Sequence, residues 1–315
     1  MKMKNEMKLT GVIVAVVMAA APALARAQDE RSFTQLDTTV RLDRGGAVDF
    51  SLISGKINAV GWDQPNVRIS ASIESGLLRF SGNSSRVTLS VDDSDEGGRR
   101  RHHGNVGEAR YDVSVPRGAR LILEAVSGDV TARGSQGEIE ASSVSGDVEV
   151  SDGARSVSVE SVSGEAHAAQ VNGNLRAETV SGDLRAENVS GNVQASTVSG
   201  DIRLVGIQSR DVRTETVSGS VSYAGTIEPS GRYGFESHSG TIRLNIPRNA
   251  GANFSVETFS GSIDTDFPVT LLPGQKRREG HMDFTIGDGR ARVTAQTFSG
   301  EIIISNGSTT RREDE

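Results

Sequence analysis

A nine-residue repeat built around a Ser-Gly pair constrains this chain more than any other feature of its sequence. The unit Glu-Thr-Val-Ser-Gly-Asp-Val-x-Ala fits residues 178–186, and a close copy follows at once at residues 187–195. A short fixed period predicts that each unit stacks on copies of itself. A stack of near-identical units rarely brings dissimilar catalytic groups together, so the repeat predicts architecture more strongly than activity.

The Ser-Gly pairs are the predicted corners of this stack. An odd period needs one break per unit in the inward–outward alternation of a strand, and glycine tolerates the positive φ angle of a sharp bend. The strong copies are Ser127-Gly128, Ser145-Gly146, Ser163-Gly164, Ser181-Gly182, Ser190-Gly191, Ser199-Gly200, Ser218-Gly219, Ser239-Gly240, Ser260-Gly261 and Ser299-Gly300.

Nine extended residues reach only about 30 Å, which is too short to encircle a core, so two repeats are needed for one coil. The sequence therefore predicts an all-β, single-stranded β-solenoid (a β-helix or β-roll) with two short strands per coil of 18–21 residues. Its interior is predicted to stack valine on valine and alanine on alanine. The stack is expected to widen toward its C-terminal end, where Phe254, Phe259, Phe267 and Phe298 occur.

Changes in composition divide the chain into segments. Residues 1–27 have the lysines, the apolar run and the A-x-A site of an export signal, with a retained membrane anchor as the alternative. Residues 28–118 are predicted to form an N-terminal β region that caps the solenoid, with a mobile charged loop at 92–109. The repeats occupy residues 119–305, and a polar tail follows at 306–315.

Composition also excludes some classes of function. The chain has no cysteine, which removes disulfides, thiolate metal sites and cysteine nucleophiles. Its formal net charge is −7, and the mature chain is more acidic still because the export signal is basic. Nucleic acid is therefore not an expected partner. No transmembrane segment is expected in the mature chain.

Two acidic ladders follow from the repeat, and each has two interpretations. The residue after Ser-Gly either accepts hydrogen bonds from the turn backbone or binds calcium. The residue three before serine either forms a solvated face paired with arginine or forms a charged binding strip. The first ladder comprises Asp129, Asp147, Glu165, Asp183, Asp201 and Glu301. The second comprises Glu124, Glu160, Glu178, Glu187, Glu215, Glu236 and Glu257.

Isolated residues offer little chemistry. Trp62 is expected to cap the core, with a sugar platform as the alternative. His102 and His103 follow three arginines in the charged loop, and a metal site there is only weakly indicated. No catalytic, cofactor-binding or metal-ligating residue is assigned.

The Val-Ser-Gly-Asp-Val pattern resembles the bacterial putative-adhesin family of β-strand-repeat domains of unknown function. The resemblance covers roughly residues 38–305 and includes Ser54-Gly55 and Gly61-Trp62-Asp63. It implies export, a β-helical fold and adhesion, and it brings no catalytic motif.

We therefore expect an exported, non-catalytic, adhesin-like structural or interaction module of the periplasm or cell surface. Its expected partner is an unidentified envelope protein or glycan, and no cofactor is expected. A carbohydrate-active β-helix enzyme, a lyase or hydrolase acting on envelope polysaccharide, is the alternative.

Overall fold

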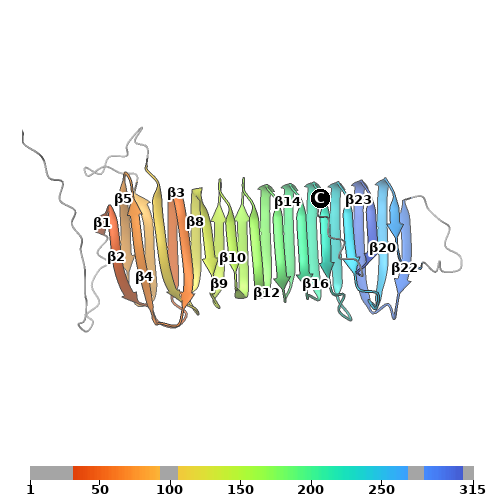
Figure 1. The fold of residues 1–315 in the computed structure, drawn as a ribbon, viewed down its shortest axis with the longest axis horizontal. Helices are drawn as coiled ribbons and strands as arrows, with labels where there is room; N and C mark the ends of the chain where they lie inside the picture. The colour runs from red at the N-terminus through yellow and green to blue at the C-terminus, as the bar shows by residue number, and fades with distance from the viewer. Residues whose placement is uncertain (1–30, 93–105, 269–279, 308–315) are drawn as a thin grey trace, which may run out of the picture.

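The computed structural model describes residues 31–92, 106–268 and 280–307, which contain 24 strands and no helix. The strands form one continuous hydrogen-bonded network, drawn out along a single axis (Figure 1). This confirms the predicted all-β, solenoid-like architecture. The described residues include no helix with the length and hydropathy needed to cross a membrane. The predicted export signal and most of the predicted loop and tail lie outside the described residues.

The pairings divide the network into two ladders of strands. The first ladder runs from one end of the molecule to the other in the order β1 (Arg31–Phe33), β5 (Leu77–Gly82), β6 (Arg86–Asp92), β3 (Ala47–Trp62), β8 (Arg120–Arg133), β9 (Glu138–Ser143), β11 (Ala154–Ser161), β12 (Ala166–Ser181), β14 (Val193–Ser199), β16 (Asp211–Ser218), β18 (Arg232–Ser239), β23 (Ala291–Ser299), β20 (Ala252–Ser260) and β22 (His281–Ile286).

The second ladder runs beside the first. Strands β3, β8 and β12 belong to both ladders because each continues around a corner from one to the other. The order is β2 (Gln35–Arg41), β4 (Asn66–Ile73), β7 (Ala109–Pro116), β3, β8, β10 (Val148–Ser151), β12, β13 (Leu184–Val189), β15 (Ile202–Ile207), β17 (Val221–Gly225), β19 (Ile242–Ile246), β24 (Ile302–Asn306) and β21 (Ile263–Thr265).

The coil length agrees with the predicted 18–21 residues. Equivalent residues lie 18 apart from β8 to β14, 19 apart from β14 to β16, and 21 apart from β16 to β18. These strands are parallel and in register, so each residue stacks on its equivalent about 4.8 Å away.

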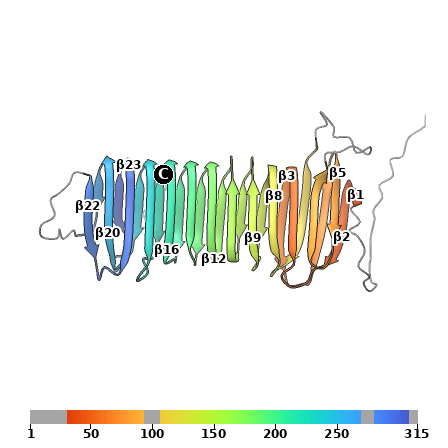
Figure 2. The ribbon, with the colours of Figure 1, turned by 180° about the vertical axis from the view of Figure 1, so that it is seen from behind.

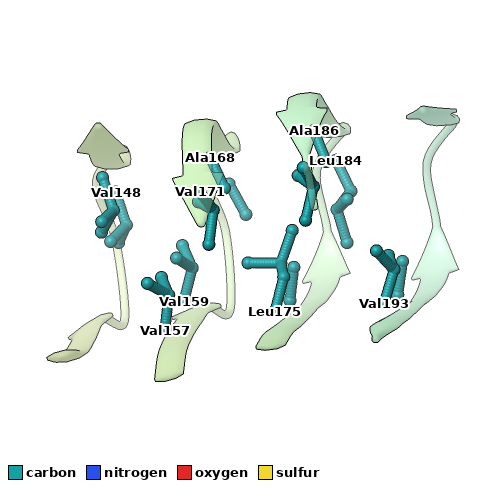
Figure 3. Close-up of a cluster of buried hydrophobic side chains, with 14 of the residues drawn as sticks. Val148, Val157, Val159, Ala168, Val171, Leu175, Leu184, Ala186 and Val193 are labelled. Carbon is teal, nitrogen blue, oxygen red and sulfur yellow. The ribbon is translucent and has the colours of Figure 1, made fainter. Parts of the chain in front are cut away.

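The interior consists of small and branched side chains from both ladders. Figure 3 shows Val157 and Val159 of the first ladder near Val148, Ala168 and Val171 of the second. All five are almost fully buried. The valine and alanine stacking expected from the sequence is therefore present in this core.

Aromatic side chains fill the core where the coils lengthen. The ring of Tyr223 lies 5.2 Å from that of Phe235 and 6.2 Å from that of Tyr233. The two tyrosine hydroxyls donate hydrogen bonds to main-chain carbonyls, to that of Thr226 at 2.7 Å and to that of Ser209 at 2.6 Å. Burial raises the pKa of both tyrosines, so both remain neutral donors.

The phenylalanines divide between interior and surface. Phe254 and Phe267 are buried as expected, whereas Phe298 is 50% exposed and Phe259 is 79% exposed. The expectation that these last two widen the core is therefore wrong. They occupy the position just before the corner serine, which faces outward in every coil of the first ladder that carries the motif.

The C-terminal coils do not stack in chain order. Strand β23 pairs with β18 on one side and with β20 on the other, and β24 lies in the same way between β19 and β21. The last coil in the sequence is thus inserted between two earlier ones. Figures 1 and 2 show β22 at the end of the molecule, outside β20 and β23. The sequence-based expectation that each strand pairs with the next coil along the chain is wrong here.

Antiparallel strands flank the parallel stack at its ends. Strand β22 pairs antiparallel with β20, and the β5–β6 and β2–β4 pairs near the N-terminus are also antiparallel. The parallel ladder nevertheless extends into the N-terminal region, because Ser54-Gly55 of β3 stacks on Ser127-Gly128 of β8. The boundary predicted at residues 118 and 119 stays a prediction.

The corner glycines are required by close contact between coils. A Cβ atom on Gly182 would lie 2.1 Å from the carbonyl oxygen of Gly164, and one on Gly200 would lie 2.1 Å from that of Gly182. Neither Gly182 nor Gly200 has a positive φ angle. The predicted reason for glycine, a bend at positive φ, is therefore wrong at these two corners, although Gly191, Gly240 and Gly261 do have positive φ angles. The same contact continues through Gly55, Gly128, Gly146, Gly164, Gly182, Gly200, Gly219, Gly240, Gly300 and Gly261.

We predict that Gly182→Ala lowers the free energy of unfolding by about 1–3 kcal/mol, because the added methyl group meets backbone that cannot move away. Urea denaturation followed by circular dichroism measures the change. Gly118→Ala is the matched control, since its Cβ position has no atom within 4 Å. Equal stability of the two variants would contradict the prediction.

Candidate functional site

An exposed row of apolar side chains runs along the first ladder. These residues immediately precede the corner serines, and their exposed fractions range from 43% to 79%. We call them the apolar row: Val126, Val144, Val162, Val180, Val198, Val217, Phe298 and Phe259. Their exposure was not expected from the sequence, which had suggested that the residue before serine contributes to the core.

The position that does face inward near the corner carries a hydroxyl group. Thr179, next to Val180, is buried, and Ser143 and Ser161 are its equivalents in earlier coils. The Ser143 hydroxyl donates to the carbonyl of Gly128 at 2.8 Å, and that of Ser161 donates to Gly146 at 3.1 Å. The sequence analysis missed this role, although serine or threonine recurs two residues before the corner serine. We call this set the hydroxyl row: Ser143, Ser161, Thr179, Thr197, Thr216, Ser237, Thr297 and Thr258.

A row of glutamates lies beside the apolar row, two residues earlier on the same outward face. Its members are Glu124, Glu160, Glu178, Glu215, Glu236 and Glu257, here called the acidic row. Arg176 pairs with Glu178 at 2.6 Å, and Arg213 pairs with Glu215. Glu187 does not belong to this row. It lies on β13 in the second ladder, beside Val205.

Stacked rings end the apolar row. The rings of His238 and Phe298 lie 5.0 Å apart with an interplanar angle of 5°, and those of Phe298 and Phe259 lie 4.8 Å apart at the same angle. This spacing equals the separation of neighbouring strands in a sheet. The in-register pairing of β18, β23 and β20 therefore positions the three rings.

The three rows line an open groove along the solenoid with a volume of about 990 Å³. Its apolar walls come from valines of the apolar row and from the stacked rings. No lysine or arginine lines the groove. Its acidic side chains are Glu160, Glu178, Glu215, Glu236 and Glu257. The groove therefore combines apolar surface with negative charge.

The carboxylates after the corner glycines bond to the neighbouring coil. The Glu165 N–H donates to Asp147 Oδ1 at 2.8 Å, and the Asp201 N–H donates to Asp183 Oδ1 at 2.9 Å. The predicted role in the backbone is therefore present for Asp129, Asp147, Asp183 and Asp201, but the donor belongs to the next coil and not to the same turn. The side chain of Glu165 instead pairs with Arg185, and that of Glu301 accepts a hydrogen bond from the Ser262 hydroxyl. Within the described ranges, no three His, Asp or Glu side chains come together as a potential metal-ligand set.

Other candidate residues lie away from the groove. Gly191 stacks on Gly173, so Ser190-Gly191 turns the opposite edge of the coil from the other strong copies. The Trp62 indole N–H donates to the Asn66 carbonyl at 2.6 Å, which ties together the turn after β3. His102 and His103 lie outside the described residues.

The chain was compared with known proteins. The model of the toastrack family DUF4097 matches residues 63–305. Among curated proteins nothing matches the chain.

Similar solved structures include three bacterial proteins of low sequence identity. A putative adhesin from Bacteroides fragilis is 11% identical, with 90% of this chain and 98% of that chain covered and a TM-score of 0.36. A putative lipid binding protein from Parabacteroides distasonis is 13% identical, with 87% and 96% covered and a TM-score of 0.38. A putative cell adhesion protein from Clostridium sporogenes is 12% identical, with 86% and 99% covered and a TM-score of 0.22.

We predict that Asp129, the carboxylate after the corner glycine of β8, makes the fold sensitive to acid. Lys56 Nζ lies 2.9 Å from Asp129 Oδ2, and the hydrogen bond it donates holds the pKa of Asp129 below its ordinary value of 3.8. Because the folded-state pKa is depressed, this contribution is present above about pH 4 and is lost as the pH falls through the folded-state pKa. The side chains are 64% and 44% exposed, so the effect is small.

Urea midpoints measured between pH 7 and pH 2 check this prediction. Asp129→Asn is expected to be less stable than the wild type at pH 7 and to lose the difference in acid. In a Lys56→Met background the same substitution is expected to have a smaller effect. A difference between Asp129→Asn and wild type that does not change with pH would count against the assignment.

Proposed function

This chain belongs to the toastrack DUF4097 family, and we propose that it is a non-catalytic, adhesin-like interaction module exported to the cell envelope. The partner would dock in the groove formed by the apolar, hydroxyl and acidic rows. Export and the location in the periplasm or at the cell surface are part of this proposal, as is the absence of catalysis.

The exposed apolar row is the observation that carries the proposal. Leaving apolar surface in water costs about 25 cal/mol for each Å². Scattered exposed valines are ordinary on a protein surface, but a contiguous apolar strip usually marks an interaction site. Here the strip has eight apolar members on nine neighbouring coils, with the His238 ring at the same position on the remaining coil, and alternation within each strand directs these side chains outward.

The makeup of the groove supports binding over catalysis. An active site needs different groups in a defined arrangement, such as an acid, a base and a nucleophile. The groove repeats one set of groups from coil to coil: valine, a hydroxyl bonded to the backbone, and glutamate. Such repetition suits a long partner that makes the same contact several times.

We predict that three substitutions in the apolar row abolish most binding to envelope material. Val180→Thr, Val198→Thr and Val217→Thr each keep the β-branched shape of valine but replace a methyl group with a hydroxyl. Purified protein would be titrated against immobilised envelope fractions of the producing bacterium. Saturable binding by the wild type, with at least about a tenfold loss of affinity in the triple variant, is expected from the lost apolar contact.

Val60→Thr is the matched control for this experiment. Val60 is 41% exposed on β3 and does not line the groove. The control is expected to bind as the wild type does, and circular dichroism melts check that all variants fold. Saturable binding that the triple variant retains would place the interaction elsewhere, and lack of saturable binding by the wild type would overturn the proposal.

Export is tested separately by expressing the full-length chain in a Gram-negative bacterium. Cleavage after Ala27 is expected to release a mature protein that begins at Gln28, with cleavage after Ala25 as the second choice. Mass spectrometry of the periplasmic fraction measures the new terminus. An uncleaved chain that stays in the cytoplasm would contradict export.

A further inference from the structure

We propose that the groove of the first ladder takes a cationic amphipathic α-helix of a partner protein, lying along the solenoid axis. This inference rests on the proposed function, since it identifies the partner of the same groove. It is carried by the charge of the groove, by the spacing of its rows and by the rings at its end.

The charge of the groove selects a cationic partner. Its lining includes five glutamates and one histidine, His238, but no lysine or arginine. Arg176 and Arg213 partly neutralise Glu178 and Glu215 from the neighbouring outward row. Arg213 also attracts Glu236 at longer range. Within the described part of the chain, neither Glu236 nor Glu257 forms a direct ion pair. Lysine or arginine side chains of a partner that lies above the acidic row would therefore pair with carboxylates, most of all near the C-terminal end of the groove.

The spacing of the rows favours a helix over an extended chain. Successive valines of the apolar row are one strand apart, about 4.8 Å. An α-helix rises 5.4 Å per turn, so its apolar stripe drifts by only about 0.6 Å at each coil. A strand laid along the same axis presents same-face side chains about 6.7 Å apart and is out of step within one or two coils. Over five helical turns the drift adds up to about 2.4 Å, or about 1.2 Å on either side of a central match, so a helix of this length stays close to the row.

The length and the end of the groove fit such a helix. From Val144 to Phe259 the apolar row covers eight coils, or roughly 34 Å at the spacing between strands. A helix of 18 residues is about 27 Å long. At the end of the row, the outermost ring, that of Phe259, is 79% exposed, and Glu257 lies two residues away on the same face. An aromatic face beside a carboxylate is a favourable position for an arginine or lysine.

Two other occupants fit the groove less well. A second copy of this chain would bring a second acidic row against the first, and like charges repel at such a distance. An anionic membrane would be repelled for the same reason, because its surface attracts basic segments and not acidic ones.

Three synthetic peptides of 18 residues test the proposal with the full mature protein. The first places leucine at helical spacing, i, i+3, i+4 and i+7, with lysine elsewhere. The second has the same composition in strict alternation. The third repeats the helical pattern with glutamate in place of lysine. Affinity is measured by fluorescence anisotropy, and peptide helicity by circular dichroism.

We expect the helical lysine peptide to bind at least about tenfold more tightly than either of the others and to become more helical on binding. A double variant, Glu236→Gln with Glu257→Gln, and the triple threonine variant of the apolar row are each expected to weaken it by about tenfold. Glu187→Gln is the matched control. It removes one negative charge by the same Glu→Gln change, also three residues before a Ser-Gly pair but on the second ladder, and its effect is compared with that of Glu236→Gln alone.

The inference would be overturned by equal affinity for the alternating peptide, by affinity unchanged in the groove variants, or by binding of phosphatidylglycerol vesicles that depends on the apolar row. Dimers that depend on the apolar row in analytical ultracentrifugation would also overturn it. If none of the peptides binds, but the triple threonine variant that includes Val198→Thr still loses envelope binding, the cationic helix is rejected and the proposed function stands. If the wild type binds neither the peptides nor the envelope fractions, both the cationic helix and the proposed function are rejected.

Discussion

The contact between glycines of neighbouring coils fixes the register on which the rest of the molecule depends. At the corner edge the backbone of one coil lies so near the next that a Cβ on Gly182 would meet the Gly164 carbonyl at 2.1 Å. This contact stacks the Ser-Gly pairs directly on one another and leaves no freedom for a coil to slip. Additional residues in a coil must therefore go to the opposite edge. There Gly206 adopts a φ of 68° beside a register shift in β15, and Ser230 adopts a φ of 64° before β18.

Because the register is fixed, each position of the repeat forms a row of equivalent residues. A charged position therefore places like charges next to one another along the whole row. Carboxylates after the corner glycines stand one above another, and main-chain N–H groups of the next coil stabilise them. The acidic row has fewer such donors. It is interrupted by Ser142, Ser196 and Gln296, which separate the glutamates into shorter groups. The rows on this face thus carry more negative charge than their neighbours neutralise, and they border the apolar row.

The sequence was sufficient to predict the repeated coil but not its edges or its order. The repeat correctly predicted a core of stacked valine and alanine, such as Val159 and Ala168, because the alternation that buries them is local. It could not distinguish the two edges of a coil, because a nine-residue motif such as Ser190-Gly191 occurs on either one. Thr179 was overlooked, since the carbonyl that satisfies its hydroxyl belongs to another coil. The insertion of β23 depends on pairing across 60 residues, for which local pattern carries no information.

That insertion has a consequence for the time course of folding. A chain that emerges from its N-terminus can add each central coil to the one before it, since those partners are close in sequence. Growth stops at β18, because its next partner is β23, which arrives after β20 and β22. Until residues 291–306 are available, the edge of β18 stays unpaired, and β20 and β21 of the outer coil lack the strands with which they form parallel pairs. Folding of the outer coils therefore depends on a segment that is synthesised after them, and the pairing of β23 with β18 and β20 is the step that joins them to the rest of the solenoid.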